Sequence, residues 1–134
     1  MLCCPLGTHS KGEAMSDFLI HIHTGPENPT KATLGCLVAA TALKAGHDVR
    51  VFMAGDGVRL LDPEVIETLE GQGTGKLRDH LAEIEALGGR LYLSGMSAKA
   101  RGYDASLLEG HPAEFAMPDV LVGLADEATK VLCY

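Results

Sequence analysis

The stretch FLIHIHTGPENPTKATLGCLVAATALKAGHDVRVFMAG, residues 18–55, decides the fold. Its first part, residues 18–24, is rich in β-branched and aromatic residues and stops at a Gly-Pro pair, which predicts a strand followed by a loop. Alanine and leucine dominate residues 29–45, which predicts a helix. Residues 47–55 predict a second strand. A strand, a helix and a strand in this order are typical of a parallel βαβ unit.

The helix predicted over residues 29–45 has clear ends. Asn28 or Thr30 can cap its first turn, and Gly46 follows its last turn. Apolar residues cover most of its circumference, so we expect it to be covered on two sides, by the sheet and by another subunit.

The rest of the chain repeats this alternation of strands and helices. After the second strand we expect a short helical piece through Leu61, a glycine-rich loop that opens an amphipathic helix, strands at 90–94, 111–117 and 130–134, and a helix that begins at Pro118. The sequence therefore predicts a three-layer α/β domain over residues 16–134, with a mostly parallel five-stranded, flavodoxin-like sheet. Residues 1–15 are expected to be a disordered or extension segment.

Composition excludes several classes of function. The 134 residues carry a formal charge of -7, which repels nucleic acid and an anionic membrane surface. There is no apolar run long enough to span a membrane and no secretory signal, so we expect a cytoplasmic protein. The four cysteines show neither a C-x-x-C pair nor zinc-ligand spacing, so neither a disulfide framework nor a metal is expected, and no cofactor is indicated.

Polar residues follow three of the predicted strands. In a doubly wound sheet with the first strand between the second and the third, three pairs of residues gather at one edge: His23 and Thr24, Asp56 and Gly57, Ser94 and Gly95. The turn after residues 91–93 leads into a basic helix with Lys99 and Arg101, which suits an anion. A tight turn followed by a solvated basic helix explains the same residues equally well.

Catalytic and metal-binding interpretations are weaker. Ser94, His23 and Asp56 are the residue types of a hydrolase triad, but the motif G-x-S-x-G is absent around Ser94. His21 and His23 point to one face of the first strand, as two metal ligands do, although histidines hydrogen-bonded in or beside the core are the more common case. The segment EGQGTGKL fails the phosphate-loop motif at both ends.

Two cysteines lie within the predicted domain. Cys36 is in the middle of the first helix, where a thiol packs as a small hydrophobe with a raised pKa. Cys133 lies on the closing strand, where its exposure decides whether it can react. The sequence shows no activating base for either thiol.

Together, GPENPTKATLGCLVAATALKAGHDV, FMAGDGV, LYLSGMSAKARG and the terminal KVLCY resemble the DsrE/DsrF-like family, which includes the YchN-like proteins, over residues 16–134. The resemblance implies a small α/β domain that assembles as a homo-trimer or hexamer. It also implies a role in sulfur relay, in which a cysteine holds sulfane sulfur as a persulfide. The family's active cysteine, at the end of the third strand or just after it, corresponds here to Ser94, whose hydroxyl forms no persulfide.

We therefore expect an oligomeric binding or accessory protein of sulfur-related metabolism whose partner is a small anion or a sulfur-relay protein. Its ligand site is predicted at Thr24, Asn28, Asp56, Ser94, Gly95, Ser97 and Arg101. The two serines would donate hydrogen bonds to the anion and Arg101 would pair with it. The alternative is an enzyme, a sulfurtransferase that uses Cys36 or Cys133.

Overall fold

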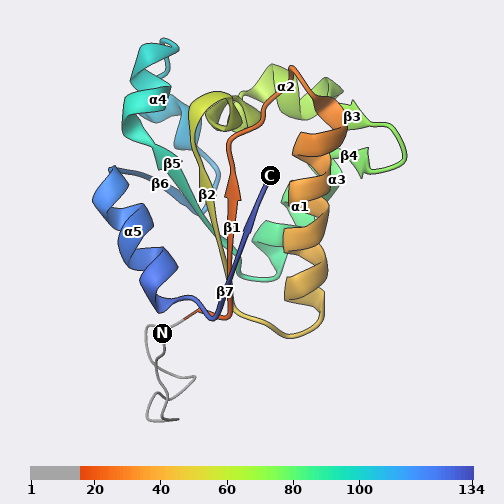
Figure 1. Ribbon diagram of the computed structural model, residues 1–134. Helices are drawn as coiled ribbons and strands as arrows, with labels where there is room; N and C mark the ends of the chain where they lie inside the picture. Colours follow the sequence, from red (N-terminus) through yellow and green to blue (C-terminus); the bar gives the residue numbers. More distant parts are fainter. Residues whose placement is uncertain (1–15) are drawn as a thin grey trace.

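The computed structural model describes residues 16–134, and the expected extension at 1–15 lies outside them. Five parallel strands form one sheet in the order β6-β5-β2-β1-β7 (Figure 1). They are β1 (Phe18–Ile22), β2 (Val49–Met53), β5 (Arg90–Ser94), β6 (Ala113–Ala116) and β7 (Lys130–Cys133). The predicted α/β class and the parallel five-stranded sheet are confirmed.

Helices cover both faces of this sheet. α1 (Pro29–Lys44) and α3 (Leu77–Ala86) lie on one face, and α5 (Pro118–Glu127) lies on the other (Figure 1). Asn28, rather than Thr30, caps α1, because its side chain accepts a hydrogen bond from the backbone N–H of Lys31. Shorter elements complete the fold: η1 (Gly55–Leu61), α2 (Pro63–Thr68), β3 (Glu70–Gly71), β4 (Gly75–Lys76), α4 (Gly95–Ala100) and η2 (Ala105–Leu108).

The predicted order of the strands is wrong. β2 lies between β1 and β5, and β1 lies between β2 and β7, whereas we expected the first strand between the second and the third. The chain moves from β1 to β6 in one direction, with its connections on the α1 face, and then returns to β7 through α5 on the opposite face. Right-handed crossovers require this change of face when the direction reverses.

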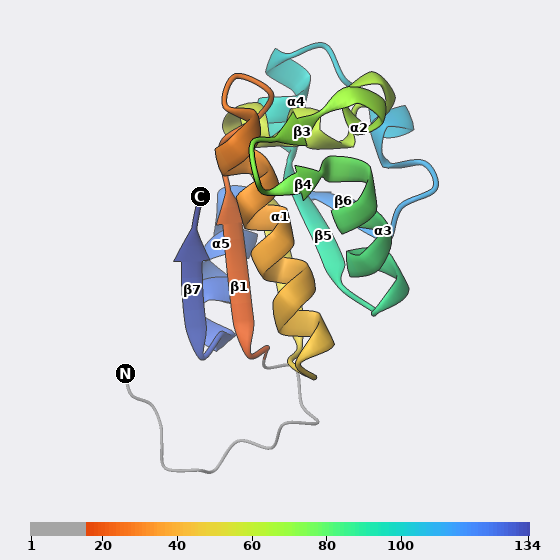
Figure 2. The ribbon, with the colours of Figure 1, turned by 90° about the vertical axis from the view of Figure 1, so that its right-hand side faces the viewer.

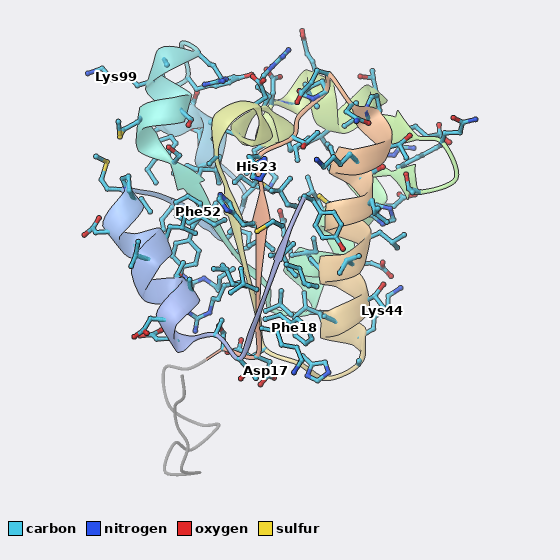
Figure 3. All side chains as sticks on the ribbon, in the orientation of Figure 1. Asp17, Phe18, His23, Lys44, Phe52 and Lys99 are labelled. Atoms are coloured by element: carbon cyan, nitrogen blue, oxygen red, sulfur yellow. The ribbon has the colours of Figure 1, made fainter. Side chains whose placement is uncertain are left out.

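Two apolar cores lie on the two faces of the sheet. The larger core contains Ile20, Val51 and Leu93 with residues of α1 and α3. The smaller core, under α5, is formed by buried side chains at Leu19, Phe52, Ala116 and Leu124. Figure 3 shows Phe52 on the α5 side of the sheet and Phe18 on the α1 side, as the alternation of side chains along a strand requires.

A short hairpin of two-residue strands forms part of the glycine-rich segment expected before α3. β3 and β4 pair antiparallel and lie over α1 and α3, as Figure 2 shows. The hydroxyls of Thr33 on α1 and Thr74 in the hairpin are 2.6 Å apart. A Cβ at Gly71 would stand 1.9 Å from Thr74 Oγ1, so glycine is required where the hairpin meets the helix.

Across residues 16–134, no helix combines the length and the apolar composition that a membrane crossing requires.

Candidate functional site at the carboxyl ends of β2 and β5

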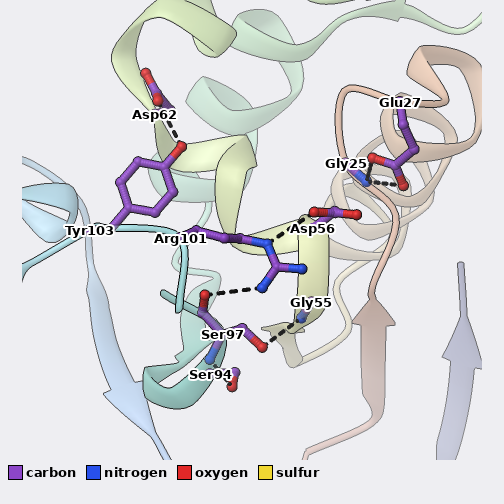
Figure 4. A network of polar contacts seen from close by, with 9 residues as sticks. All are labelled: Gly25, Glu27, Gly55, Asp56, Asp62, Ser94, Ser97, Arg101 and Tyr103. Carbon is purple, nitrogen blue, oxygen red and sulfur yellow. Dashed lines mark hydrogen bonds and ion pairs between the residues drawn. The ribbon is translucent and has the colours of Figure 1, made fainter. Parts of the chain in front are cut away.

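Two strand ends lie next to each other at the carboxyl edge of the sheet. Met53 of β2 and Leu93 of β5 are register partners, so η1, which follows β2, and α4, which follows β5, are neighbours. Their polar residues form one cluster, which Figure 4 shows from close by. We call it the strand-end cluster, and it consists of Gly55, Asp56, Ser94, Ser97 and Arg101.

The two serine hydroxyls of the cluster join α4 to its surroundings. Ser94 Oγ accepts a hydrogen bond from the backbone N–H of Ser97 at 3.1 Å and so caps α4. Ser97 Oγ accepts one from the backbone N–H of Gly55 at 2.8 Å. Both serines were predicted to donate hydrogen bonds to a ligand, and in the structure their oxygens accept hydrogen bonds from backbone N–H groups. Each hydroxyl still has its own proton to donate.

Arg101 is paired within the protein. Its Nε donates to Asp56 Oδ1 at 2.9 Å and its Nη1 to the carbonyl oxygen of Ser97 at 3.1 Å. These two bonds use two of the five guanidinium N–H groups, which leaves donors for an anion. The side chains of Arg101 and Asp56 are 32% and 42% exposed, so solvent screens the pair and a ligand can reach it.

The loop after β1 is pressed against η1. A Cβ on Gly25 would stand 2.1 Å from the carbonyl oxygen of Asp56, and one on Gly57 would stand 2.3 Å from that of Ile22. The Gly25 N–H donates to both carboxylate oxygens of Glu27, at 3.0 and 3.1 Å (Figure 4). Only glycine permits these backbone contacts, which fix the position of Asp56. In the sequence, only the glycines that follow the first two strands, Gly25 and Gly57, indicated that the loop after β1 contacts η1.

Three further predicted ligand residues lie in the loop after β1, at the start of α1 and at the start of α4. Thr24 is buried, and Asn28 serves as the cap of α1. Gly95 is the first residue of α4. A separate hydrogen bond near the cluster joins the hydroxyl of Tyr103, which donates, to Asp62 at 2.8 Å (Figure 4). Burial raises the pKa of Tyr103, and the hydrogen bond to Asp62 raises it further, so the phenol stays protonated near neutral pH.

The hydrolase triad is not assembled. Ser94 Oγ is engaged with the N–H of Ser97, and Asp56 with Arg101. The imidazole of His23 lies against that of His21, with ring centroids 5.2 Å apart. None of the three side chains is hydrogen-bonded to another of the three within the described residues, so acyl transfer has no support in this geometry.

Among residues 16–134 there is no group of three or more His, Cys, Asp or Glu side chains that could hold a metal ion. A surface hollow over α2 is lined by Pro63, Glu64, Glu67 and Thr68, none of which belongs to the strand-end cluster.

The two cysteines differ in access. Cys36 is fully buried in α1, and burial raises the pKa of its thiol to about 12, as its position in the sequence predicted. Cys133 on β7 is exposed. A thiol with the pKa of Cys36 is almost entirely protonated near neutral pH, so only Cys133 of these two is accessible for chemistry.

These features can be compared with known proteins. Residues 16–134 match the profile of the DsrE/DsrF-like family. The chain belongs to the DsrE/DsrF-like family. No curated protein matches its sequence.

Solved structures share the fold of this family member at low sequence identity. The crystal structure of the YchN protein from E. coli superposes with a TM-score of 0.72 at 18% identity, over 90% of this chain and 100% of the other. A conserved protein of unknown function from Bacteroides thetaiotaomicron superposes with a TM-score of 0.62 at 16% identity, over 91% of this chain and 100% of the other. At these identities the likeness concerns the fold, and the site has to be interpreted from its own residues.

Proposed function

We propose that this DsrE/F-like protein is a cytoplasmic binding or accessory module of sulfur-related metabolism, which takes a small anion or a sulfur-relay protein at the strand-end cluster. The observation that supports the proposal is the serine at position 94. Ser94 stands where the sulfur-carrying members resembled by this sequence have their cysteine, and its oxygen caps α4. A hydroxyl in that place keeps the local structure but forms no persulfide.

The charge of the cluster supports an anionic ligand of modest affinity. Arg101 is the cluster's cation, and it retains donors beyond those that Asp56 and Ser97 occupy. An anion has to compete with the Asp56 carboxylate for the guanidinium, so binding is expected to be weak and sensitive to salt.

Self-assembly belongs to the same proposal. A homo-trimer or hexamer is the assembly that the family resemblance implies. Several large apolar side chains are exposed on the single chain, among them Met96, Met117 and Val122, which suits contact with another copy. Light scattering after size exclusion tests this directly, and a monomer at micromolar concentration would contradict it.

A calorimetric titration with thiosulfate, and separately with sulfate, tests the anion site. Arg101→Met should abolish the binding heat. Lys99→Met is the matched control, because Lys99 is an exposed cation of α4 that points outward from the molecule (Figure 3) and has no bond to the cluster among the described residues. Equal binding of both anions by wild type and Arg101→Met would contradict the assignment.

The rival function is sulfur transfer through Cys36 or Cys133. The burial and the raised pKa of Cys36 count against that residue. The exposure of Cys133 keeps this function open as a second candidate.

A further inference from the structure

The edge strand β7 has backbone groups that point away from the sheet. Among the described residues, β1 is the only strand that pairs with β7. The N–H groups of Lys130 and Tyr134 donate to carbonyl oxygens of the segment 17–21, at 3.0 and 2.8 Å. In a parallel ladder, alternate residues bond to opposite neighbours, so the N–H and C=O groups of Val131 and Cys133 point away from β1. These two residues therefore present donors and acceptors at the edge of the sheet.

The side chains of the same two residues lie on the less covered face. Leu132 and Tyr134 pack against the core on the α1 face, so Val131 and Cys133 point to the opposite face. Val131 is 43% exposed, and Cys133 is exposed. Among the described residues, the core under α5 takes side chains from β1, β2 and β6 and none from β7. Both the edge of β7 and its α5-side face are open to another chain.

The other edge of the sheet is less suited to strand pairing. β6 has the exposed Glu114 in its middle, and Pro112 and Pro118 lie close to its two ends. Charges and prolines on an edge strand discourage the addition of another strand. In β7, which Figure 2 shows at the free edge of the sheet, the one charged residue is Lys130 at the first position. Of the two edges, β7 is therefore the one that fits a further strand.

We infer that β7 pairs antiparallel with β7 of a second copy of this chain, across a two-fold axis at Leu132. The axis places Val131 opposite Cys133 of the second copy, and Cys133 opposite Val131. Directly opposed residues of this kind exchange both of their N–H···O bonds. All the outward backbone groups of the strand then have partners, and the sheets of the two copies become continuous.

The charge and the faces of β7 agree with this register. The axis puts Lys130 opposite Tyr134 of the second copy, so the lysines of the two strands do not oppose each other. A two-fold axis perpendicular to the sheet also keeps the α5 face of one copy on the same side as that of the other. The exposed Val131 side chain is then covered by the Cys133 side chain of the second copy.

This inference rests on the self-assembly part of the proposed function and assigns one of its contacts. A two-fold contact requires an even number of copies, so light scattering after size exclusion should give a hexamer or a dimer. A trimer would overturn the pairing of β7 and leave self-assembly in place. A monomer would contradict both, and neither result bears on the anion site at Arg101.

Two substitutions at Val131 test the edge. Val131→Pro removes the outward N–H and leaves the hydrogen bonds to β1 intact, while Val131→Lys adds a charge to the edge and keeps the backbone N–H. Each variant should halve the mass of the assembly, with a wild-type circular dichroism spectrum. Leu87→Lys is the control, because Leu87 is 47% exposed and lies at the end of α3. It should keep the wild-type mass. An unchanged mass in either folded Val131 variant would overturn the inference.

Disulfide trapping tests the register. The parent protein carries Cys3→Ser and Cys4→Ser, and Val131→Cys is added to it. Cα atoms of a hydrogen-bonded antiparallel pair are about 5.5 Å apart, within the range of about 4.4–6.8 Å that a disulfide spans. Oxidation by air should link the introduced thiol to Cys133 of the second copy, giving a covalent dimer on a non-reducing gel. The parent protein and its Leu87→Cys variant should give none. Absence of the dimer, or a link between the two copies of Cys133, would overturn this register.

Discussion

Replacing Asp56 by asparagine should strengthen anion binding. The Asp56 carboxylate holds Arg101 Nε at 2.9 Å and so competes with any anion for the guanidinium. The second anchor of Arg101, the carbonyl oxygen of Ser97 at 3.1 Å, does not depend on Asp56. In Asp56→Asn the guanidinium therefore stays in place while its competing charge is gone.

The exposure of the pair sets the size of the effect. With side chains 32% and 42% exposed, the ion pair is of the surface type. Such pairs contribute about 0.2–1 kcal/mol, after screening by solvent and salt. At about 1.4 kcal/mol per tenfold change, the Kd for thiosulfate should fall by a factor of roughly 1.4 to 5.

Calorimetric titration at low ionic strength measures this change. Asp104→Asn is the control, because it removes an equal charge from an exposed residue whose carboxylate bonds to Ser106 rather than to Arg101. Its affinity for thiosulfate should match that of the wild type. Weaker binding by Asp56→Asn would refute the reasoning, since Asp56 would then hold the site in shape instead of competing with the ligand.

Three other substitutions test the structure around the site. Gly25→Ala should lower the free energy of unfolding by about 1–3 kcal/mol, because its Cβ would meet the Asp56 carbonyl oxygen at 2.1 Å. In the control Gly123→Ala the new Cβ meets nothing within 4 Å, so the free energy of unfolding should not fall. Urea unfolding compares the two variants. Ser94→Ala should cost about 0.5–2 kcal/mol in the same assay through loss of the α4 cap, and an unchanged midpoint would contradict that role. Burial raises the pKa of Cys36 from 9.0 to about 12. Between these two pH values the thiol ionises in the unfolded chain and stays protonated in the folded one, so the free energy of unfolding should fall as the pH rises. The fall should be smaller in Cys36→Ala, which has no thiol. Equal pH dependence in both proteins would show that Cys36 is not the group responsible.

The sequence predicted the elements of this fold better than their arrangement. The apolar and β-branched pattern of each segment, and the glycines that follow it, located β1, α1 and β2 correctly, because local propensity and burial favour the same structure there. The order of the strands was missed, because parallel strands buried on both faces show the same apolar pattern whichever neighbour they pair with.

The proximity of the cluster residues was predicted in part for a similar reason. Asp56, Ser94, Ser97 and Arg101 do come together, since the ends of parallel strands share one edge of the sheet. Their hydrogen-bond roles were not foreseen, because a cap or an ion pair depends on atomic positions that the residue types do not fix.

The central proposal is that the strand-end cluster corresponds to the sulfur-carrying site of the family, with Ser94 in the place of its thiol. Mapping of added sulfur by mass spectrometry, after incubation with polysulfide, tests it in wild type and Ser94→Cys. The account predicts that Ser94→Cys gains one sulfur on the introduced thiol, and that Cys36 stays unmodified in both proteins. An introduced thiol that takes up no sulfur, or a wild type that carries sulfur on Cys36, would contradict the account.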